Sequence, residues 1–135
     1  MAVNIEEVEG IGPAYAEKLR AAGVATTEGL LEAGATPKGR EALGEQTGIS
    51  HKLLLEWVNH VDLMRLKGVG SEYSDLLEAA GVDSPLELGH RNAANLAQTI
   101  EAYNAEHKIV RRVPTEHEIA GWIDEAKRLP KIVEH

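Results

Sequence analysis

The chain has 135 residues, of which 43% are hydrophobic and 27% charged, and this predicts a soluble protein of one domain or two small packed halves. It contains no cysteine, which excludes disulfides, thiol nucleophiles and cysteine-ligated metal sites. The net charge of −8 argues against a surface dominated by phosphate binding, and we find neither a membrane span nor a leader, so we expect a cytoplasmic protein.

Aromatic residues make up only 4% of the chain and phenylalanine is absent, whereas alanine, leucine and glycine are plentiful. Strands are signalled by alternating runs of β-branched and aromatic residues, and such runs are scarce in this sequence. Alanine, leucine, glutamate and lysine at three- and four-residue spacing are typical of helices instead. The predicted fold class is therefore all-α.

Start and stop residues divide the first half of the chain into five predicted helices. Four cover residues 4–8, 13–22, 27–33 and 37–47, and Ser50 caps a fifth that carries an apolar stripe of Leu54, Trp57, Val58 and Val61. Pro13 suits a first helical position because its missing N–H would have no helical partner there. Gly23, Gly34 and Gly48 are suited to end helices.

The second half repeats this plan. Predicted helices cover residues 71–80, 85–88, 92–106 and 115–129, and residues 131–135 are expected to be extended. Thr115 and Glu118 have the spacing of a capping box, in which each side chain accepts the other residue's backbone N–H. Trp57 and Trp122 lie on apolar stripes, so we expect both to pack in the core.

The strongest feature of the sequence is an internal repeat. Residues 8–15 are echoed by residues 66–73 at an offset of 58 (68 − 10), and residues 21–24 match residues 79–82 at the same offset. The two tryptophans are 65 apart (122 − 57), so about seven residues are inserted before the second, most simply within 108–114. We predict two repeats, residues 1–60 and 61–135, packed as one pseudo-twofold compact domain because each half has few large apolar residues.

Each repeat opens with an apolar residue between two glycines. Glycine adopts backbone angles closed to other residues and lets the main chain approach a neighbour closely. Backbone N–H groups at the start of the next helix can bind an anion such as phosphate. The candidate binding residues are therefore the two turns, Gly10, Ile11, Gly12, Pro13 and Ala14 in the first repeat and Gly68, Val69, Gly70, Ser71 and Glu72 in the second.

These turns resemble the helix-hairpin-helix motif. Together with residues 9–13 and 21–24 and the ending at 114–130, they make the chain similar to the bacterial family called domain of unknown function 4332, a tandem helix-hairpin-helix fold. That resemblance implies no particular activity. Related hairpin modules in repair enzymes, ligases and polymerases bind the DNA backbone non-specifically, often with a monovalent cation. The resemblance thus leaves open nucleic-acid binding and a cation at a hairpin, and we expect no other cofactor.

The charged residues near the two glycine turns argue against nucleic-acid binding. Hairpins that bind nucleic acid usually carry lysine or arginine just after the second glycine, where this chain has Pro13-Ala14 and Ser71-Glu72. Phosphate binding without those cations is expected to be weak. The cations left for an anionic partner are Lys18, Lys67, Arg111 and Arg112. We therefore expect a binding or scaffold module for a protein partner or a second copy, with nucleic-acid backbone binding as the alternative.

Signals for catalysis are weaker still. The sequence has no Gly-x-Ser-x-Gly, no phosphate-binding loop ending in Gly-Lys-Ser/Thr and no His-Glu-x-x-His, so we expect neither an enzyme nor a small-molecule substrate. His51 and His60 are nine residues apart, which does not place both imidazoles on one helical face. We expect the six histidines to be solvated or capping residues, and we predict no metal site.

Overall fold

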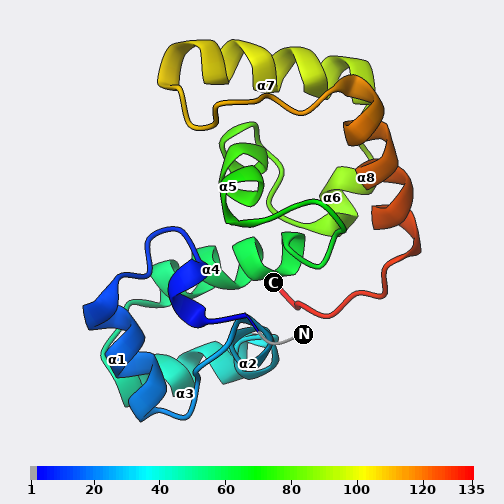
Figure 1. The fold of residues 1–135 in the computed structure, drawn as a ribbon. Coiled ribbons are helices and arrows are strands. Elements are labelled where there is room, and N and C mark those ends of the chain that lie inside the picture. The colour runs from blue at the N-terminus through cyan, green and yellow to red at the C-terminus, as the bar shows by residue number, and fades with distance from the viewer. Residues whose placement is uncertain (1–2) are drawn as a thin grey trace. The chain divides into compact units, whose positions relative to one another are not determined.

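The computed structural model describes residues 3–135 and contains eight α-helices and one short 3-10 helix in that range (Figure 1). No strand occurs among the described residues, where Asn4 and Thr26 form an isolated antiparallel bridge. The all-α prediction is confirmed. Residues 1 and 2 of the first predicted repeat lie outside the described part of the chain.

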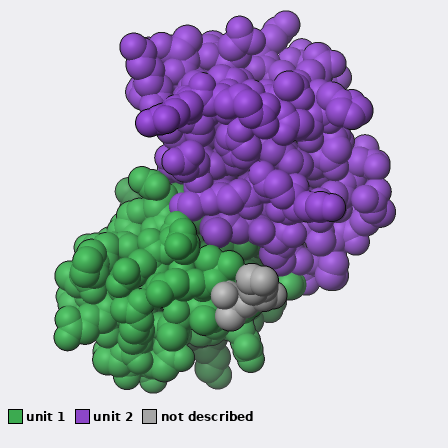
Figure 2. Space-filling model, in the orientation of Figure 1, with its two compact units in different colours: residues 1–62, 132–135 green, residues 63–131 purple. Residues whose placement is uncertain are grey.

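The chain divides into two compact units (Figure 2). Unit 1 comprises residues 1–62 together with 132–135, and unit 2 comprises residues 63–131. The four C-terminal residues thus group with the first unit, whereas the sequence placed them in the second repeat.

Unit 1 contains the first helices of the chain. In order they are the 3-10 helix η1 (Ile5–Glu7) and the α-helices α1 (Pro13–Ala21), α2 (Thr27–Ala33), α3 (Pro37–Thr47) and α4 (His51–Leu63), whose last residue belongs to unit 2. Helix α1 packs against η1 and α3, and α2 packs against α3. The predicted stripe on α4 faces inward, because Leu54, Trp57, Val58 and Val61 are all buried.

The C-terminal segment belongs to unit 1 because backbone and side-chain hydrogen bonds hold it there. The N–H of Glu134 donates to the carbonyl of Ala35 at 2.7 Å, and Nη2 of Arg40 donates to the carbonyl of Glu134 at 2.8 Å. Val133, the residue directly before Glu134, is 1% exposed. The composition of residues 131–135 did not predict that this segment packs on unit 1, because the arginine that donates to the Glu134 carbonyl lies 94 residues earlier in the chain.

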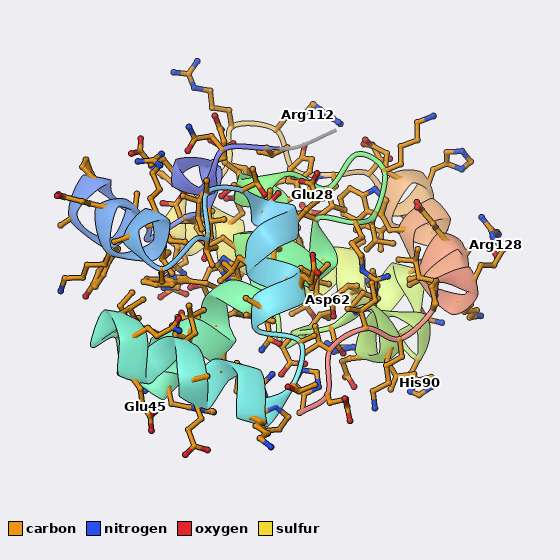
Figure 3. All side chains as sticks on the ribbon, turned by 90° about the horizontal axis from the view of Figure 1, so that it is seen from below. Glu28, Glu45, Asp62, His90, Arg112 and Arg128 are labelled. Atoms are coloured by element: carbon orange, nitrogen blue, oxygen red, sulfur yellow. The ribbon has the colours of Figure 1, made fainter. Side chains whose placement is uncertain are left out.

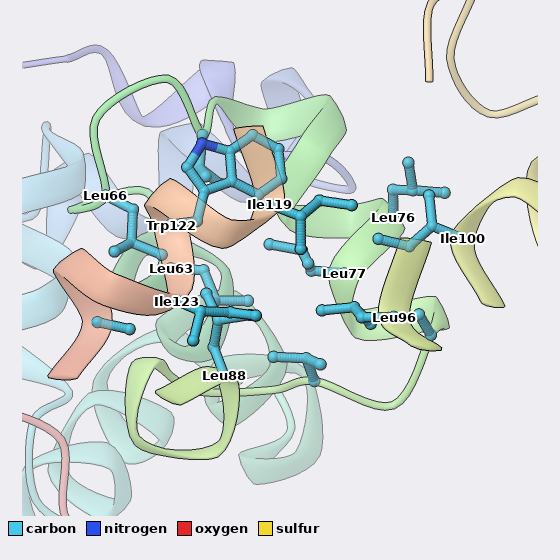
Figure 4. Packing of buried hydrophobic residues seen from close by; sticks show 14 of the residues in the cluster. Leu63, Leu66, Leu76, Leu77, Leu88, Leu96, Ile100, Ile119, Trp122 and Ile123 are labelled. Atoms are coloured by element: carbon cyan, nitrogen blue, oxygen red, sulfur yellow. The ribbon is translucent and has the colours of Figure 1, made fainter. Parts of the chain in front are cut away.

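Unit 2 contains α5 (Ser71–Ala79), α6 (Pro85–Gly89), α7 (Ala93–His107) and α8 (Glu116–Arg128). Helix α8 packs against α6 and α7, and α5 packs against α7. Leucine and isoleucine side chains from all four helices pack with Trp122 in one core (Figure 4). Burying these side chains is the main favourable term that holds the unit together.

Helix starts separate into two kinds. Helices α2, α3, α4, α6, α7 and α8 each have a side-chain oxygen that accepts an N–H of the first turn, from Thr26, Thr36, Ser50, Ser84, Asn92 and Thr115. The capping box predicted for Thr115 and Glu118 is confirmed. Among the α-helices of residues 3–135, α1 and α5 begin instead at Gly12 and Gly70, with no side-chain cap.

Candidate functional site

The first glycine turn lies beside a tryptophan in unit 1. Gly10 has φ +92°, and a Cβ placed on it would lie 3.3 Å from Nε1 of Trp57. The next residue, Ile11, is 3% exposed, and the Tyr15 ring meets the Trp57 ring edge-on at 5.0 Å between centroids. The turn is therefore packed onto the interior of its unit through both Ile11 and Trp57.

The second glycine turn has the same local geometry in unit 2. Gly68 has φ +88°, and a Cβ placed on it would lie 3.4 Å from Nε1 of Trp122. Val69 is 4% exposed, and the ring centroids of Tyr73 and Trp122 are 5.5 Å apart. Since Trp57 and Trp122 are 2% and 5% exposed, the prediction that both tryptophans belong to the core is confirmed.

The two glycines of each turn differ: the backbone angle and close approach expected of them are found at the first glycine and not at the second. Gly12 and Gly70 have φ −86° and −96°, a region open to any residue, and a Cβ on either would meet nothing within 4 Å. Of the four glycines in the two turns, Gly10 and Gly68 are the ones that combine a positive φ with a neighbour within 3.4 Å. The second glycines instead leave the first turns of α1 and α5 without a capping side chain.

The four basic residues predicted to contact an anionic partner lie in different local environments. Lys18 lies on α1 with Nζ 5.9 Å from the Tyr15 ring centroid. Lys67 precedes the second turn, and its backbone N–H donates to Oε1 of Glu125 at 3.1 Å. Arg111 and Arg112 are exposed in the loop between α7 and α8, and the Arg112 side chain extends outward from the ribbon (Figure 3).

Unit 2 brings the start of α5 and the loop after α7 together around an open pocket of about 790 Å³. Its lining comprises Glu72, Tyr73, Asn104, Lys108, Ile109, Val110, Arg111 and Arg112. Three of the predicted site residues, Glu72, Arg111 and Arg112, therefore share one pocket. The other residues of the second turn and Lys67 do not line it.

Asn104 and Tyr73 were not among the predicted site residues, although both shape the pocket. The Asn104 amide donates to the Val110 carbonyl at 3.0 Å and accepts the Val110 N–H at 2.9 Å. The Tyr73 hydroxyl donates to the Arg112 carbonyl at 2.9 Å. A signal for Asn104 was present in the sequence, because it continues the four-residue spacing of Leu96 and Ile100, both of which are buried.

Arg112 is the most strongly paired of the predicted cations. Its Nη1 and Nη2 donate to the two carboxylate oxygens of Glu118 at 2.8 and 2.9 Å, a bidentate arrangement. This side-chain hydrogen bond, followed by the one from the Thr115 backbone, lowers the pKa of Glu118 to about 2, and the pKa of Arg112 is raised by the same pair. The guanidinium is therefore already engaged by a carboxylate of its own unit.

This pair predicts a pH dependence of stability. Because folding lowers the pKa of Glu118 from 4.5 to about 2, its contribution is present above pH 4.5 and is lost as the pH falls towards 2. In Glu118→Gln we expect a flatter loss of stability over this window, measured by urea denaturation at steps of pH. Asp124→Asn is the control, since Asp124 makes an exposed ion pair with Arg128. Equal slopes for wild type and Glu118→Gln would contradict the assignment.

The histidine expectation is wrong at one position. His60 is 3% exposed, whereas we predicted solvated or capping histidines. The physical reason is its place on α4, three residues after the buried Trp57 and therefore on the inward face. Among residues 3–135, no group of three or more histidine, aspartate and glutamate side chains is arranged to hold a metal ion, and no helix is long and apolar enough to cross a membrane.

The fold defines this chain as an all-helical protein of two compact units, each with a glycine turn packed against a tryptophan. Residues 9–129 match the family described as domain of unknown function (DUF4332), and the chain belongs to that family. No curated protein and no solved structure matches the chain.

Proposed function

We propose that the chain is a non-catalytic binding or scaffold module, built on two helix-hairpin-helix turns, whose partner is another protein. The observation that carries the proposal is the pocket beside the second turn. It combines apolar Ile109 and Val110 with Tyr73 and with charges of both signs. Aromatic and apolar surface with interspersed polar groups is typical of surfaces that bind proteins.

The electrostatics around the turns support a protein over a phosphate backbone. Glu72 is exposed in the first turn of α5, where it opposes an approaching anion. Arg112 is paired with Glu118, and Arg20 on α1 is paired with Glu6 at 3.1 Å. Phosphate-backbone affinity depends largely on cations that are free to displace counterions, and these two arginines are already paired with carboxylates.

The proposal is tested by photo-crosslinking in the native host. A benzophenone amino acid is placed at Ala14 or at Glu72, both exposed at the turns, and at the exposed Lys52 on α4 as a control. We expect discrete protein adducts from at least one turn position and none from position 52. Nucleic-acid adducts from the turn positions, or identical adducts from all three, would overturn the proposal.

The alternative function is non-sequence-specific binding of DNA or RNA backbone through the turn amides. One observation favours it: α1 and α5 begin without a capping side chain, whereas the other α-helices of residues 3–135 have one. Uncapped first-turn N–H groups together with the helix dipole attract anions.

Supplying the missing caps separates the two functions. In Gly12→Ser with Gly70→Ser, the new hydroxyls are expected to cap α1 and α5 and to leave stability equal or higher by a few tenths of a kcal/mol. Backbone binding, where it exists, should weaken because the same N–H groups are then occupied. We would measure fluorescence anisotropy with duplex and single-stranded DNA at two salt concentrations. Tight, salt-sensitive binding that the double variant abolishes would establish the alternative.

A further inference from the structure

The pocket of unit 2 is built mainly by a helix connection that is longer than its counterpart in unit 1. Helices α3 and α4 of unit 1 are joined by the three residues 48–50, whereas α7 and α8 of unit 2 are joined by the eight residues 108–115. Five of the eight lining residues, 108–112, come from this longer connection. A connection longer than its counterpart is the usual place for a binding function added to a scaffold.

This loop is held in one shape. Lys108 is the one non-glycine residue with positive φ in the described chain, at +50°, and its N–H donates to the Asn104 carbonyl at 2.8 Å. The Asn104 side chain holds Val110 by two hydrogen bonds, and Asn104 is 8% exposed. At the far end of the loop, Tyr73 and Glu118 fix Arg112. A loop fixed in advance loses little conformational entropy when a ligand binds.

Two cations of the loop remain available. Lys108 and Arg111 are exposed, and neither makes an ion pair with any of residues 3–135, in contrast to the bidentate pair of Arg112 and Glu118. Between them lie Ile109, which is half-buried, and Val110. The wall formed by residues 108–111 thus has a positive side chain at each end and two apolar residues between them.

We propose that this pocket binds an extended acidic peptide segment of a partner protein. Its carboxylates pair with Lys108 and Arg111, and an apolar side chain between them packs on Ile109. The inference rests on the proposed protein-binding function and assigns to it a site and a chemical class of partner.

Glu72 on the same pocket decides between a peptide and a nucleic acid. A nucleic-acid strand carries a negative charge at every nucleotide, about 3.4 Å apart along a duplex, so some phosphate would face Glu72. A peptide places its charges at chosen positions and can present an amide or a basic group to that carboxylate. The arrangement of Glu72, Lys108 and Arg111 around the pocket therefore favours a peptide.

The test uses the ¹⁵N-labelled full-length chain titrated with a nine-residue peptide that alternates glutamate and valine. Comparison ligands are the same peptide with glutamine for glutamate and a short DNA duplex. The test variant is Lys108→Asn with Arg111→Ala, because asparagine tolerates the left-handed backbone of position 108. The control variant, Lys38→Ala with Lys52→Ala, removes two exposed positive charges from unit 1.

We expect amide shifts centred on residues 72, 73, 104 and 108–112, and a Kd raised about tenfold in the test variant and unchanged in the control. Equal binding of the glutamine peptide, equal weakening in both variants, shifts centred elsewhere or tighter binding of the DNA would overturn the proposal. Protein adducts from the crosslinker at Ala14, which lies in unit 1, do not depend on this pocket. A failed titration alongside such adducts would therefore reject the peptide site and leave the proposed function standing.

Discussion

Replacing Arg40 by alanine is expected to lower the free energy of unfolding by about 3 kcal/mol. The Arg40 side chain is 1% exposed and donates to the carbonyls of Gly34 and Glu134, both at 2.8 Å. Alanine would leave the buried carbonyl of Gly34 and the part-buried carbonyl of Glu134 without this donor, and it would open a cavity where a long side chain had packed. Burial lowers the pKa of Arg40, and the negative charge of Glu134 opposes that shift. The buried guanidinium therefore depends on its contacts to offset the cost of removing its charge from water.

The same variant should release the C-terminal segment from unit 1. We expect faster hydrogen exchange at the Glu134 amide, which donates to the carbonyl of Ala35 in the wild type. Urea denaturation followed by circular dichroism gives the stability change. Arg40→Met, which retains much of the volume, should lose less, and Lys38→Ala on the exposed side of α3 should change stability by less than about 0.5 kcal/mol. A loss below about 1 kcal/mol in Arg40→Ala would contradict the role assigned to the arginine.

The burial of Arg40 could not be predicted from the sequence. Its position on α3 gave no sign of burial, because an arginine is usually an exposed residue and its acceptor Glu134 is 94 residues away. Local signals were sufficient for the helices themselves. Thr27–Ala33 and Pro37–Thr47 begin and end as predicted, since proline and hydroxyl caps act through bonds within one helical turn.

The candidate site was predicted only in part, for the same reason. The spacing of the tryptophans placed the extra residues of the second half at 108–114, and the structure has the longer helix connection there. The sequence showed that Arg111 and Arg112 are basic, but it did not show that Glu118 engages one of them and no described carboxylate engages the other. Which of the two arginines is paired depends on the conformation of the loop between α7 and α8. A loop has no periodic sequence pattern from which its conformation could be predicted.

The second large effect is expected at the first glycine of each turn. Gly10→Ala and Gly68→Ala should each lower the free energy of unfolding by about 2 kcal/mol. Alanine is strained at φ +92° and +88°, and its Cβ would lie 3.3 Å from Nε1 of Trp57 or 3.4 Å from Nε1 of Trp122. The two costs should be similar because backbone angle and neighbour are nearly the same in both units.

The second glycines supply the matched controls. Gly12→Ala and Gly70→Ala introduce the same methyl group two residues further on, where φ is negative and nothing lies within 4 Å. We expect changes within about 0.5 kcal/mol, because the entropy lost by the unfolded chain offsets a slightly poorer cap. Urea denaturation of the four single variants checks both sets. If Gly12→Ala cost as much as Gly10→Ala, glycine would be needed at both positions of the turn. The distinction between a first glycine beside a tryptophan and an open second glycine would then be wrong.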